Sequence, residues 1–184
     1  MKKKGPWKAI KTEVCYKDPW VKVTKDKVIR PDGNLGYYSL VHIKTGVHVL
    51  PIDKKGNVYL VKEYKYGTEC FTIEAPGGGI DRGEMPLRAA KRELKEETGI
   101  KAKKWTILGI VHPISGVVKS PTHLYLAQDL SFGESSPESA EMLKIIKLPF
   151  LKAFDQAMSG KINEMTTIVL IARAKNYLKR VSAK

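Results

Sequence analysis

Apolar and polar residues alternate along the first part of the chain, in short runs separated by turn residues. The run WVKVTKDKVI begins at Trp20, and the turn sequence PDG follows it at 31–33. The runs GYYSLVHI, GVHVLPI and VYLVKEY come next. Because a period of two is typical of strands with one buried face, the pattern predicts a meander of antiparallel strands, with little helix before residue 84. Residues 1–18 are polar and predict a loosely held terminal segment.

The pattern changes to a helical period after these strands. Residues 84–98 form the first strong predicted helix, because Pro86 suits its first turn and Gly99 suits the left-handed position just past its end. The elements expected after it are strands at 107–112 and 123–130, a polar acidic loop at 131–141, a strand at 142–148, a short helix at 148–160 and an amphipathic helix within 163–182. This order predicts an α+β fold, or a sheet sandwiched between helices.

Composition adds limits to this picture. A length of 184 residues favours one domain with a small extra layer, and a hydrophobic fraction of 42% is enough for a sizeable core. The chain has no run of about eighteen apolar residues, so no membrane span is expected. The start MKKKGPWKAIK lacks the apolar stretch of a secretory signal. Cys15 and Cys70 make no metal or disulfide framework, which predicts a reduced, cytoplasmic setting.

The charge balance indicates an anionic partner. The chain has 33 Lys and Arg against 19 Asp and Glu, a formal net charge of +14. A phosphorylated small molecule and a nucleic acid both fit this excess, and nucleic acid is the less favoured of the two. The lysines are spread along most of the sequence, so a solvated basic surface is an equal alternative.

The acidic residues gather in PGGGIDRGEMPLRAAKRELKEETGI, which starts at Pro76. On a helix with 100° per residue, Glu93 and Glu97 stack on one face and Glu96 joins them. The expected core stripe of the same helix consists of Leu87, Ala90 and Leu94. Exposed like charges four residues apart cost about 0.2–0.5 kcal/mol per pair, and a divalent cation would reverse that sign.

Oxygen-rich sites of this kind suit Mg²⁺ or Mn²⁺. The preceding glycines can turn tightly and bring backbone groups close to a metal or a phosphate. The segment therefore predicts a cation site that meets a diphosphate. The alternative for a short EExG sequence alone is a solvated helix with Glu–Lys pairs.

The whole segment is similar to the Nudix box, Gx5Ex7REUxEExGU with U a bulky apolar residue. The matching residues are Gly78, Glu84, Arg92, Glu93, Leu94, Glu96, Glu97, Gly99 and Ile100. This resemblance implies a Nudix fold, an α/β/α sandwich with a mixed sheet between helices and an N-terminal antiparallel strand region. It also implies Mg²⁺- or Mn²⁺-dependent hydrolysis of a nucleoside diphosphate linked to another moiety. It implies that Glu93, Glu96 and Glu97 hold the metal, that Arg92 orients these carboxylates, and that Gly78 shapes the loop against the substrate.

The resemblance extends over most of residues 15–180, to the ADP-ribose and nucleoside-diphosphate-sugar pyrophosphatase branch. The segments that carry it are KDPWVKVTKDKVIRPDG, VYLVKEYKYG, FTIEAPGGGID, THLYLAQDL and GKINEMTTIVLIA. It implies that the carbonyl of Gly77 is a metal ligand and that Lys65 and Glu74 line the substrate pocket. It also implies that Trp20 stacks on a base, although simple strand burial is an equal alternative for a strand tryptophan.

The same resemblance implies a homodimer with exchanged N-terminal strands. The expected organisation is an N-terminal strand region for dimerisation at 1–45 and a Nudix hydrolase domain at 46–184. Relatives often carry acids where this chain has Lys119 and Ser120, which leaves the substrate moiety and the number of metals open.

The resemblance places the catalytic base on a later acidic loop. That loop offers Glu134, Glu138 and Glu141, of which Glu141 aligns best and Glu138 is the close rival. A solvated loop is the alternative, and the base would then be Glu96 or Glu97. Two further functions stay open: hydrolysis of other nucleotides or of RNA 5′ ends, and nucleotide sensing without catalysis.

Overall fold

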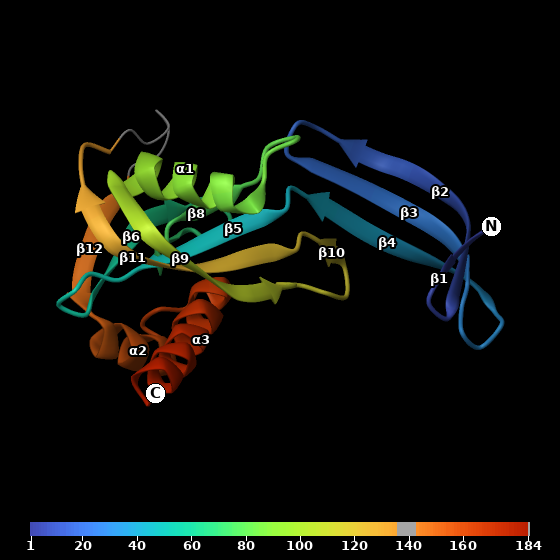
Figure 1. Ribbon diagram of the computed structural model, residues 1–184. Coiled ribbons are helices and arrows are strands. Elements are labelled where there is room, and N and C mark those ends of the chain that lie inside the picture. Colours follow the sequence, from blue (N-terminus) through green and yellow to red (C-terminus); the bar gives the residue numbers. More distant parts are fainter. Residues whose placement is uncertain (136–142, 184) are drawn as a thin grey trace. The chain divides into compact units, whose positions relative to one another are not determined.

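The computed structural model describes residues 1–135 and 143–183 (Figure 1). The chain divides into two compact units. Unit 1 comprises Met1–Thr45 and His112–Pro121, and unit 2 comprises Gly46–Val111 and Thr122–Lys184. The short segment from the middle of the chain therefore belongs with the N-terminal strands, which sequence order alone does not indicate.

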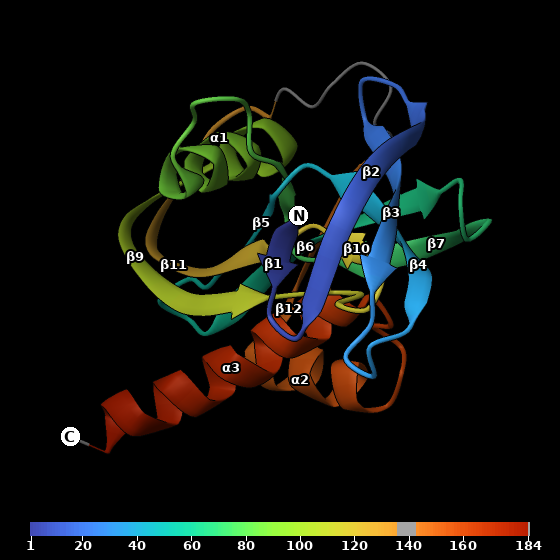
Figure 2. The same cartoon turned by 90° about the vertical axis from the view of Figure 1, so that its right-hand side faces the viewer.

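Unit 1 is built on one five-stranded sheet in the order β1-β2-β3-β4-β10 (Figure 2). Its strands are β1 (Lys2–Lys4), β2 (Trp7–Lys17), β3 (Val21–Ile29), β4 (Leu35–Ile43) and β10 (Val118–Lys119). Neighbours are antiparallel except β10, which runs parallel to β4. The predicted meander is thus present from β2 to β4.

The expectation of a loosely held N-terminus is wrong. Strand β2 pairs with β3 along most of its length. The buried carboxylate of Asp26 also accepts hydrogen bonds from Lys4 Nζ and from Thr12 Oγ1, both at 2.6 Å. Polar side chains do not prevent strand formation here, because the ladder satisfies the backbone and one buried acid binds two strands together.

Unit 2 contains a mixed four-stranded sheet, β8-β5-β11-β9, and a three-stranded sheet, β12-β6-β7. Their strands are β5 (Gly46–Pro51), β6 (Asn57–Lys65), β7 (Cys70–Glu74), β8 (Gly77–Gly79), β9 (Ile100–Val111), β11 (Thr122–Phe132) and β12 (Lys144–Pro149). Strand β5 runs parallel to β11 and antiparallel to β8. The predicted meander is therefore wrong at Gly46, where the chain leaves the first sheet and begins another.

Helix α1 (Pro86–Thr98) covers one face of the four-stranded sheet, and α2 (Phe150–Met158) and α3 (Met165–Ser182) lie on the other side (Figure 1). Two hydrophobic clusters lie between these layers and pack them together. One contains Leu50, Leu124 and Leu170, and the other contains Val49 and Leu94 together with Ala90. The predicted α/β/α arrangement of an α+β fold is confirmed.

The ends of α1 follow the sequence signals closely. Pro86 lies in its first turn, and Gly99 takes the left-handed conformation with φ of 68°. In the expected core stripe Ala90 and Leu94 are fully buried, but Leu87 is 38% exposed. Ala89 is buried in its place, because the helix turns its apolar stripe slightly towards that side.

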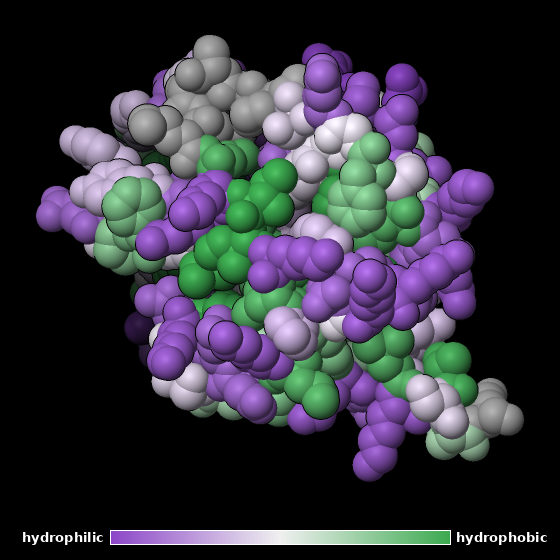
Figure 3. Space-filling model, turned by 90° about the vertical axis from the view of Figure 1, so that its left-hand side faces the viewer, coloured by the Kyte–Doolittle hydropathy of each residue, from purple (hydrophilic) through white to green (hydrophobic). Residues whose placement is uncertain are grey.

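The surface of unit 2 is mixed in character. Figure 3 shows hydrophilic side chains around a central hydrophobic patch on the side that it presents. Exposed apolar residues of this unit include Phe132, Ile145 and Leu151. Among the described residues, no helix combines the length and the apolar character that crossing a membrane requires.

Asp53 organises the turn between β5 and β6. Its carboxylate accepts hydrogen bonds from the backbone N–H groups of Lys55 and Asn57 and from the Tyr59 hydroxyl, at 2.8–2.9 Å. Burial raises the pKa of this carboxyl, but these hydrogen bonds outweigh burial and lower the pKa from 3.8 to about 2. A carboxyl group whose pKa is lower in the folded state stabilises the fold at pH values above its unfolded pKa. This contribution is lost as the pH falls through the folded pKa.

We therefore expect wild-type protein to lose unfolding free energy between about pH 4 and about pH 2 more steeply than Asp53→Asn. Urea unfolding across this range measures the difference. Asp155→Asn, exposed on α2, is the matched control and should keep the wild-type slope. Equal slopes for wild type and Asp53→Asn would contradict the assignment.

Candidate functional site

The glycine run and the acidic helix come together in unit 2. Strand β8 pairs with β5, which places Gly77 opposite His48. The backbone N–H of Gly77 donates to both carboxylate oxygens of Glu97, at 3.3 and 3.4 Å. Glu97 is only 7% exposed. A nearly buried anion on α1 is therefore held against the backbone of the glycine run.

The close approach of loop and helix requires glycine at two positions. A Cβ atom on Gly78 would lie 2.4 Å from a carboxylate oxygen of Glu93. A Cβ atom on Gly77 would lie 2.2 Å from the carbonyl oxygen of Val47. Both distances are far below any tolerated contact, so a side chain at either position must displace Glu93 or strand β5.

Arg92 connects the acidic residues to the loop. Its guanidinium donates to Glu84 through two nitrogens, at 3.0 and 3.2 Å, and to the carbonyl of Gly79 at 3.0 Å. The third nitrogen donates to Glu93 at 2.8 Å and to Glu96 at 3.1 Å. The planar fork of Arg suits such several-fold contacts, which a lysine could not reproduce.

These contacts also determine the charge states at the site. The hydrogen bond to Glu84 is the main reason that the pKa of Arg92 is raised. The same hydrogen bond lowers the pKa of Glu84. Arg92 therefore stays protonated and Glu84 stays ionised at neutral pH, so the loop and the helix remain bound by charge-assisted hydrogen bonds.

The donor set suits a hard divalent cation. Glu93, Glu96 and Glu97 supply carboxylate oxygens beside the carbonyls of the glycine run, and Mg²⁺ and Mn²⁺ prefer oxygen ligands. The Glu93 carboxylate fills the space that a side chain at Gly78 would need, so it lies directly against the glycine run. Among the described residues, however, no three His, Cys, Asp or Glu side chains already stand in a ligating arrangement. Arg92 contacts two of these carboxylates and Gly77 contacts the third.

Lys65 and Glu74, both predicted to line the pocket, lie together on the β6–β7 hairpin. Lys65 Nζ is 3.4 Å from a carboxylate oxygen of Glu74 and also pairs with Glu63. Burial lowers the pKa of Lys65, but the hydrogen bond to Glu63 and the charge of Glu74 outweigh burial and raise it. Thr72 Oγ1 donates to the other oxygen of Glu74 at 2.6 Å.

Trp20 is 72% exposed, so the alternative of simple strand burial is wrong. It lies in unit 1, in the turn between β2 and β3. The Asp18 carboxylate accepts the backbone N–H groups of Trp20 and Val21, at 2.8 and 2.6 Å. This turn fixes the backbone and leaves the indole ring available for a partner.

Of the three candidates for the catalytic base, only Glu134 belongs to the described residues. It is exposed and follows β11 directly. Gly133 donates its N–H to the carbonyl of Gly99 at 3.0 Å, so the acidic loop starts beside the C-terminal end of α1. Glu138 and Glu141 lie outside the described residues.

Sequence reasoning missed the support that α3 gives to the glycine run. The backbone N–H of Ala75 donates to Thr167 Oγ1 at 2.9 Å. Glu164 caps the start of α3 by accepting the N–H groups of Thr166 and Thr167, at 2.8 and 2.6 Å. The signal was an acid two residues before the paired threonines, but the sequence does not reveal which strand those threonines meet.

Comparison with known proteins agrees with this site. The family model described as NUDIX domain matches residues 42–155, and the one described as nucleoside diphosphate sugar hydrolase N-terminal domain matches residues 7–41. A methanol dehydrogenase activator of Bacillus methanolicus is 29% identical over 168 residues, covering 89% of this chain and 90% of the relative. An ADP-ribose pyrophosphatase of Bacillus subtilis is 27% identical over 166 residues, with the same coverage.

A solved structure supports the same fold. The crystal structure of an ADP compounds hydrolase superposes with a TM-score of 0.83 at 23% identity, covering 97% of both chains. The NUDIX domain match spans more than half of the sequence and includes both the glycine run and α1. The chain is therefore a member of the Nudix hydrolase family.

Proposed function

We propose that this protein hydrolyses the diphosphate bond of ADP-ribose or a related nucleoside diphosphate sugar, giving a nucleoside monophosphate and a sugar phosphate. The observation that carries the proposal is the acidic face of α1 against a side-chain-free loop, with Glu97 hydrogen-bonded to Gly77 and Glu93 in front of Gly78. The N-terminal match to nucleoside diphosphate sugar hydrolases and the names of the relatives support this substrate class.

The proposed ligands of Mg²⁺ or Mn²⁺ are Glu93, Glu96, Glu97 and the carbonyl of Gly77. A bound ion would neutralise diphosphate charge and lower the pKa of a coordinated water. Arg92 is a positioning residue, because it holds Glu84, Glu93 and Glu96 at fixed places around the loop. Gly78 lets the Glu93 carboxylate approach the backbone of the loop, since any side chain at this position would collide with that carboxylate.

Other residues are proposed to bind the remaining parts of the substrate. Lys65 carries a positive charge beside Glu74 and Glu63 on the β6–β7 hairpin, so this side chain can contact a phosphate while Glu74 accepts hydrogen bonds from sugar or base. Trp20, exposed in unit 1, can stack on a nucleobase.

The reaction balances as a simple hydrolysis. A water oxygen bonds to one phosphorus atom, the P–O bond to the bridging oxygen breaks, and the leaving phosphate keeps that oxygen. A carboxylate accepts the water proton. Glu141 is the first candidate for this base and Glu138 the second; if Glu134, Glu138 and Glu141 all prove dispensable, the base is Glu96 or Glu97.

Hydrolysis of other nucleotides or of RNA 5′ ends is the second candidate, favoured by the formal charge of +14. A substrate panel with Mg²⁺ distinguishes the two: ADP-ribose, ADP-glucose, GDP-mannose, UDP-glucose, a nucleoside triphosphate and 5′-triphosphorylated RNA. We expect release of two monophosphates from at least one nucleotide sugar, and none in the presence of chelator. Turnover restricted to the triphosphate or the RNA would contradict the nucleotide-sugar proposal.

A homodimer with exchanged N-terminal strands is also proposed, with residues 1–45 as the dimerisation region and residues 46–184 as the hydrolase domain. Exposed apolar side chains in unit 1, among them Val14, Trp20 and Ile43, support an interface there. Cys15 and Cys70 are both free and exposed, which supports the proposed reduced, cytoplasmic setting.

A further inference from the structure

The positive charge of the chain is concentrated in unit 1. This unit has 55 residues, with twelve Lys and Arg and four Asp and Glu, so it carries +8 of the total formal charge of +14. The larger unit 2 carries the remaining +6 on 129 residues. A uniformly basic surface would distribute charge in proportion to size, so unit 1 has an excess of its own.

Part of this charge, four lysines with one glutamate, lies on one face of the five-stranded sheet. The register places Lys11 directly opposite Lys27, and Glu13 opposite Lys25. Tyr37 on β4 lies opposite Lys27 on its other side. Because paired residues of neighbouring strands point to the same side of a sheet, these side chains share one surface. We name it the basic face, with the members Lys8, Lys11, Glu13, Lys25, Lys27 and Tyr37.

The basic face is the open side of the sheet. The residues that alternate with it on β3, namely Thr24, Asp26 and Val28, are 2–3% exposed. Lys25 and Lys27 between them are exposed, and Tyr37 is 65% exposed. On β3 the alternation therefore sends Thr24, Asp26 and Val28 to one side and Lys25 and Lys27 to the other.

The basic face also has a groove. Lys11, Glu13, Lys25, Lys27 and Tyr37 line an open pocket of about 290 Å³. Lys25 Nζ lies 4.5 Å from the ring centroid of Tyr37. The groove thus combines ammonium groups with an aromatic ring, and the Lys25 ammonium lies over one face of that ring.

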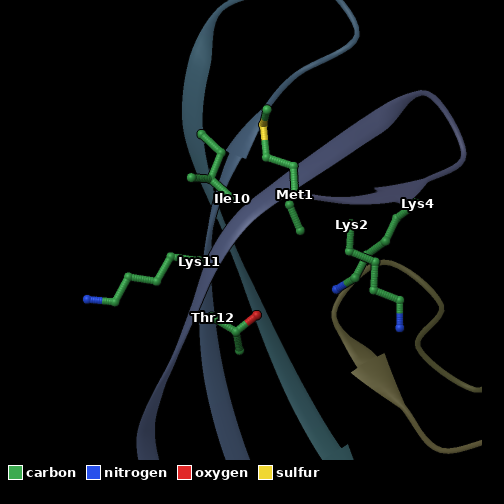
Figure 4. A pocket seen from close by; sticks show the side chains of 7 residues that line it. Met1, Lys2, Lys4, Ile10, Lys11 and Thr12 are labelled. Atoms are coloured by element: carbon green, nitrogen blue, oxygen red, sulfur yellow. The ribbon is translucent and has the colours of Figure 1, made fainter.

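Lys11 is separate from the lysines of β1. Figure 4 shows Lys11 extended away from Lys2 and Lys4, and the ammonium of Lys4 is bound by Asp26. Neither Lys11 nor Lys27 forms an ion pair with any residue that the structure describes. Like charges placed directly opposite on a sheet destabilise it, so an anion held between Lys11 and Lys27 would relieve a repulsion built into unit 1.

The combination indicates which anion fits. Ammonium groups attract backbone phosphates, and an exposed aromatic ring stacks on an unpaired base. A duplex keeps its bases stacked on one another, so it could use the lysines but not the ring. Pairing of this face with the same face of a second copy would bring the same lysines together and is disfavoured.

We propose that the basic face binds single-stranded nucleic acid, with phosphates on Lys11, Lys25 and Lys27 and a base stacked on Tyr37. This binding surface uses only residues of unit 1, and none of them is among the residues proposed for hydrolysis.

Fluorescence anisotropy of the full chain with a labelled oligouridylate of about twelve nucleotides tests the proposal. Chelator is present throughout, so that metal-dependent binding at the hydrolytic site does not contribute. The double variant Lys11→Gln/Lys27→Gln should bind at least about fivefold more weakly, and the slope of log affinity against log salt should fall by about 1.4. The matched control, Lys54→Gln/Lys55→Gln, removes two exposed charges from the β5–β6 turn of unit 2 and should bind within about twofold of wild type.

Tyr37→Ala tests the stacking component separately. It should weaken single-strand binding about fivefold or more and leave duplex binding unchanged. Urea unfolding should show Lys11→Gln/Lys27→Gln at least as stable as wild type, because the substitution removes the repulsion. Lys11→Gln/Lys27→Gln and Tyr37→Ala should each keep wild-type hydrolysis of a nucleotide sugar.

Three results would overturn the proposal. The first is an equal loss of oligonucleotide affinity in Lys11→Gln/Lys27→Gln and in Lys54→Gln/Lys55→Gln. That result would mean that the total charge alone governs binding. The second is a Tyr37→Ala protein that binds the single strand as wild type does. The third is binding to phosphatidylserine vesicles that depends on Lys11 and Lys27 while the oligonucleotide is not bound, which would assign the face to an anionic membrane surface.

Discussion

Glu97→Gln is expected to lower turnover of ADP-ribose about a thousandfold or more while the protein stays folded. Glu97 lies almost buried on α1, and its carboxylate accepts the N–H of Gly77. Gln has the same shape and keeps an oxygen acceptor for that N–H, but it has no negative charge to hold a divalent cation. The substitution therefore separates the electrostatic role of this side chain from its structural role.

Steady-state kinetics and thermal unfolding measure the two roles side by side. Glu69→Gln, exposed in the turn between β6 and β7, makes the same chemical change away from α1 and should keep wild-type kinetics. Near-normal turnover by Glu97→Gln would show that this residue is not a metal ligand. A collapse of stability without a folded, inactive state would instead assign Glu97 to the fold.

Gly78→Ala is expected to lower both stability and activity. The added Cβ would lie 2.4 Å from the Glu93 carboxylate, so either the loop or Glu93 must move. The atoms met are the carboxylate end of a flexible side chain, so Glu93 can turn away and the loss of unfolding free energy should be small. A displacement of about 1 Å at a positioned group costs about a hundredfold in rate, so kcat should fall by at least that factor.

Gly67→Ala is the matched control for this substitution. A Cβ atom at Gly67 has no heavy atom within 4 Å, and the residue lies in the β6–β7 turn of the same unit. It should keep the stability and the kinetics of wild type. If Gly78→Ala behaves like Gly67→Ala in both measurements, the close packing of loop and helix has no part in catalysis.

The helix at the centre of the site was predictable because its signals are local. Pro86 and Gly99 fix its ends through their own backbone preferences, and the spacing of Glu93, Glu96 and Glu97 follows from the helical period alone. The need for glycine at position 78 also agrees with the motif, although only the structure shows that Glu93 fills the space.

Contacts between distant segments were not predictable from the pattern. The N-terminal residues look polar and unsupported, but Asp26 binds Lys4 and Thr12, which are 22 and 14 residues away, and so joins three consecutive strands. In the same way, Thr167 supports the strand before the glycine run through Ala75, 92 residues earlier in the chain. No local preference encodes such pairings, because they depend on which strands become neighbours.

The distribution of charge is a third case. The lysines are spread along most of the sequence, which makes a simple solvated surface an equal alternative to an anionic partner. Strand register then places Lys11 opposite Lys27 on one open face, so a local concentration arises from residues sixteen positions apart. Charge patches on sheets are hidden in this way whenever the residues that form them come from different strands.

Product analysis of ADP-ribose incubated with the full chain and Mg²⁺ tests the central claim most directly. Separation of the products by ion-exchange chromatography should show AMP and ribose 5-phosphate in equal amounts, with neither formed when chelator is present. The absence of both products, or an equal yield of them in chelator, would contradict metal-dependent cleavage of the diphosphate bond at the acidic face of α1.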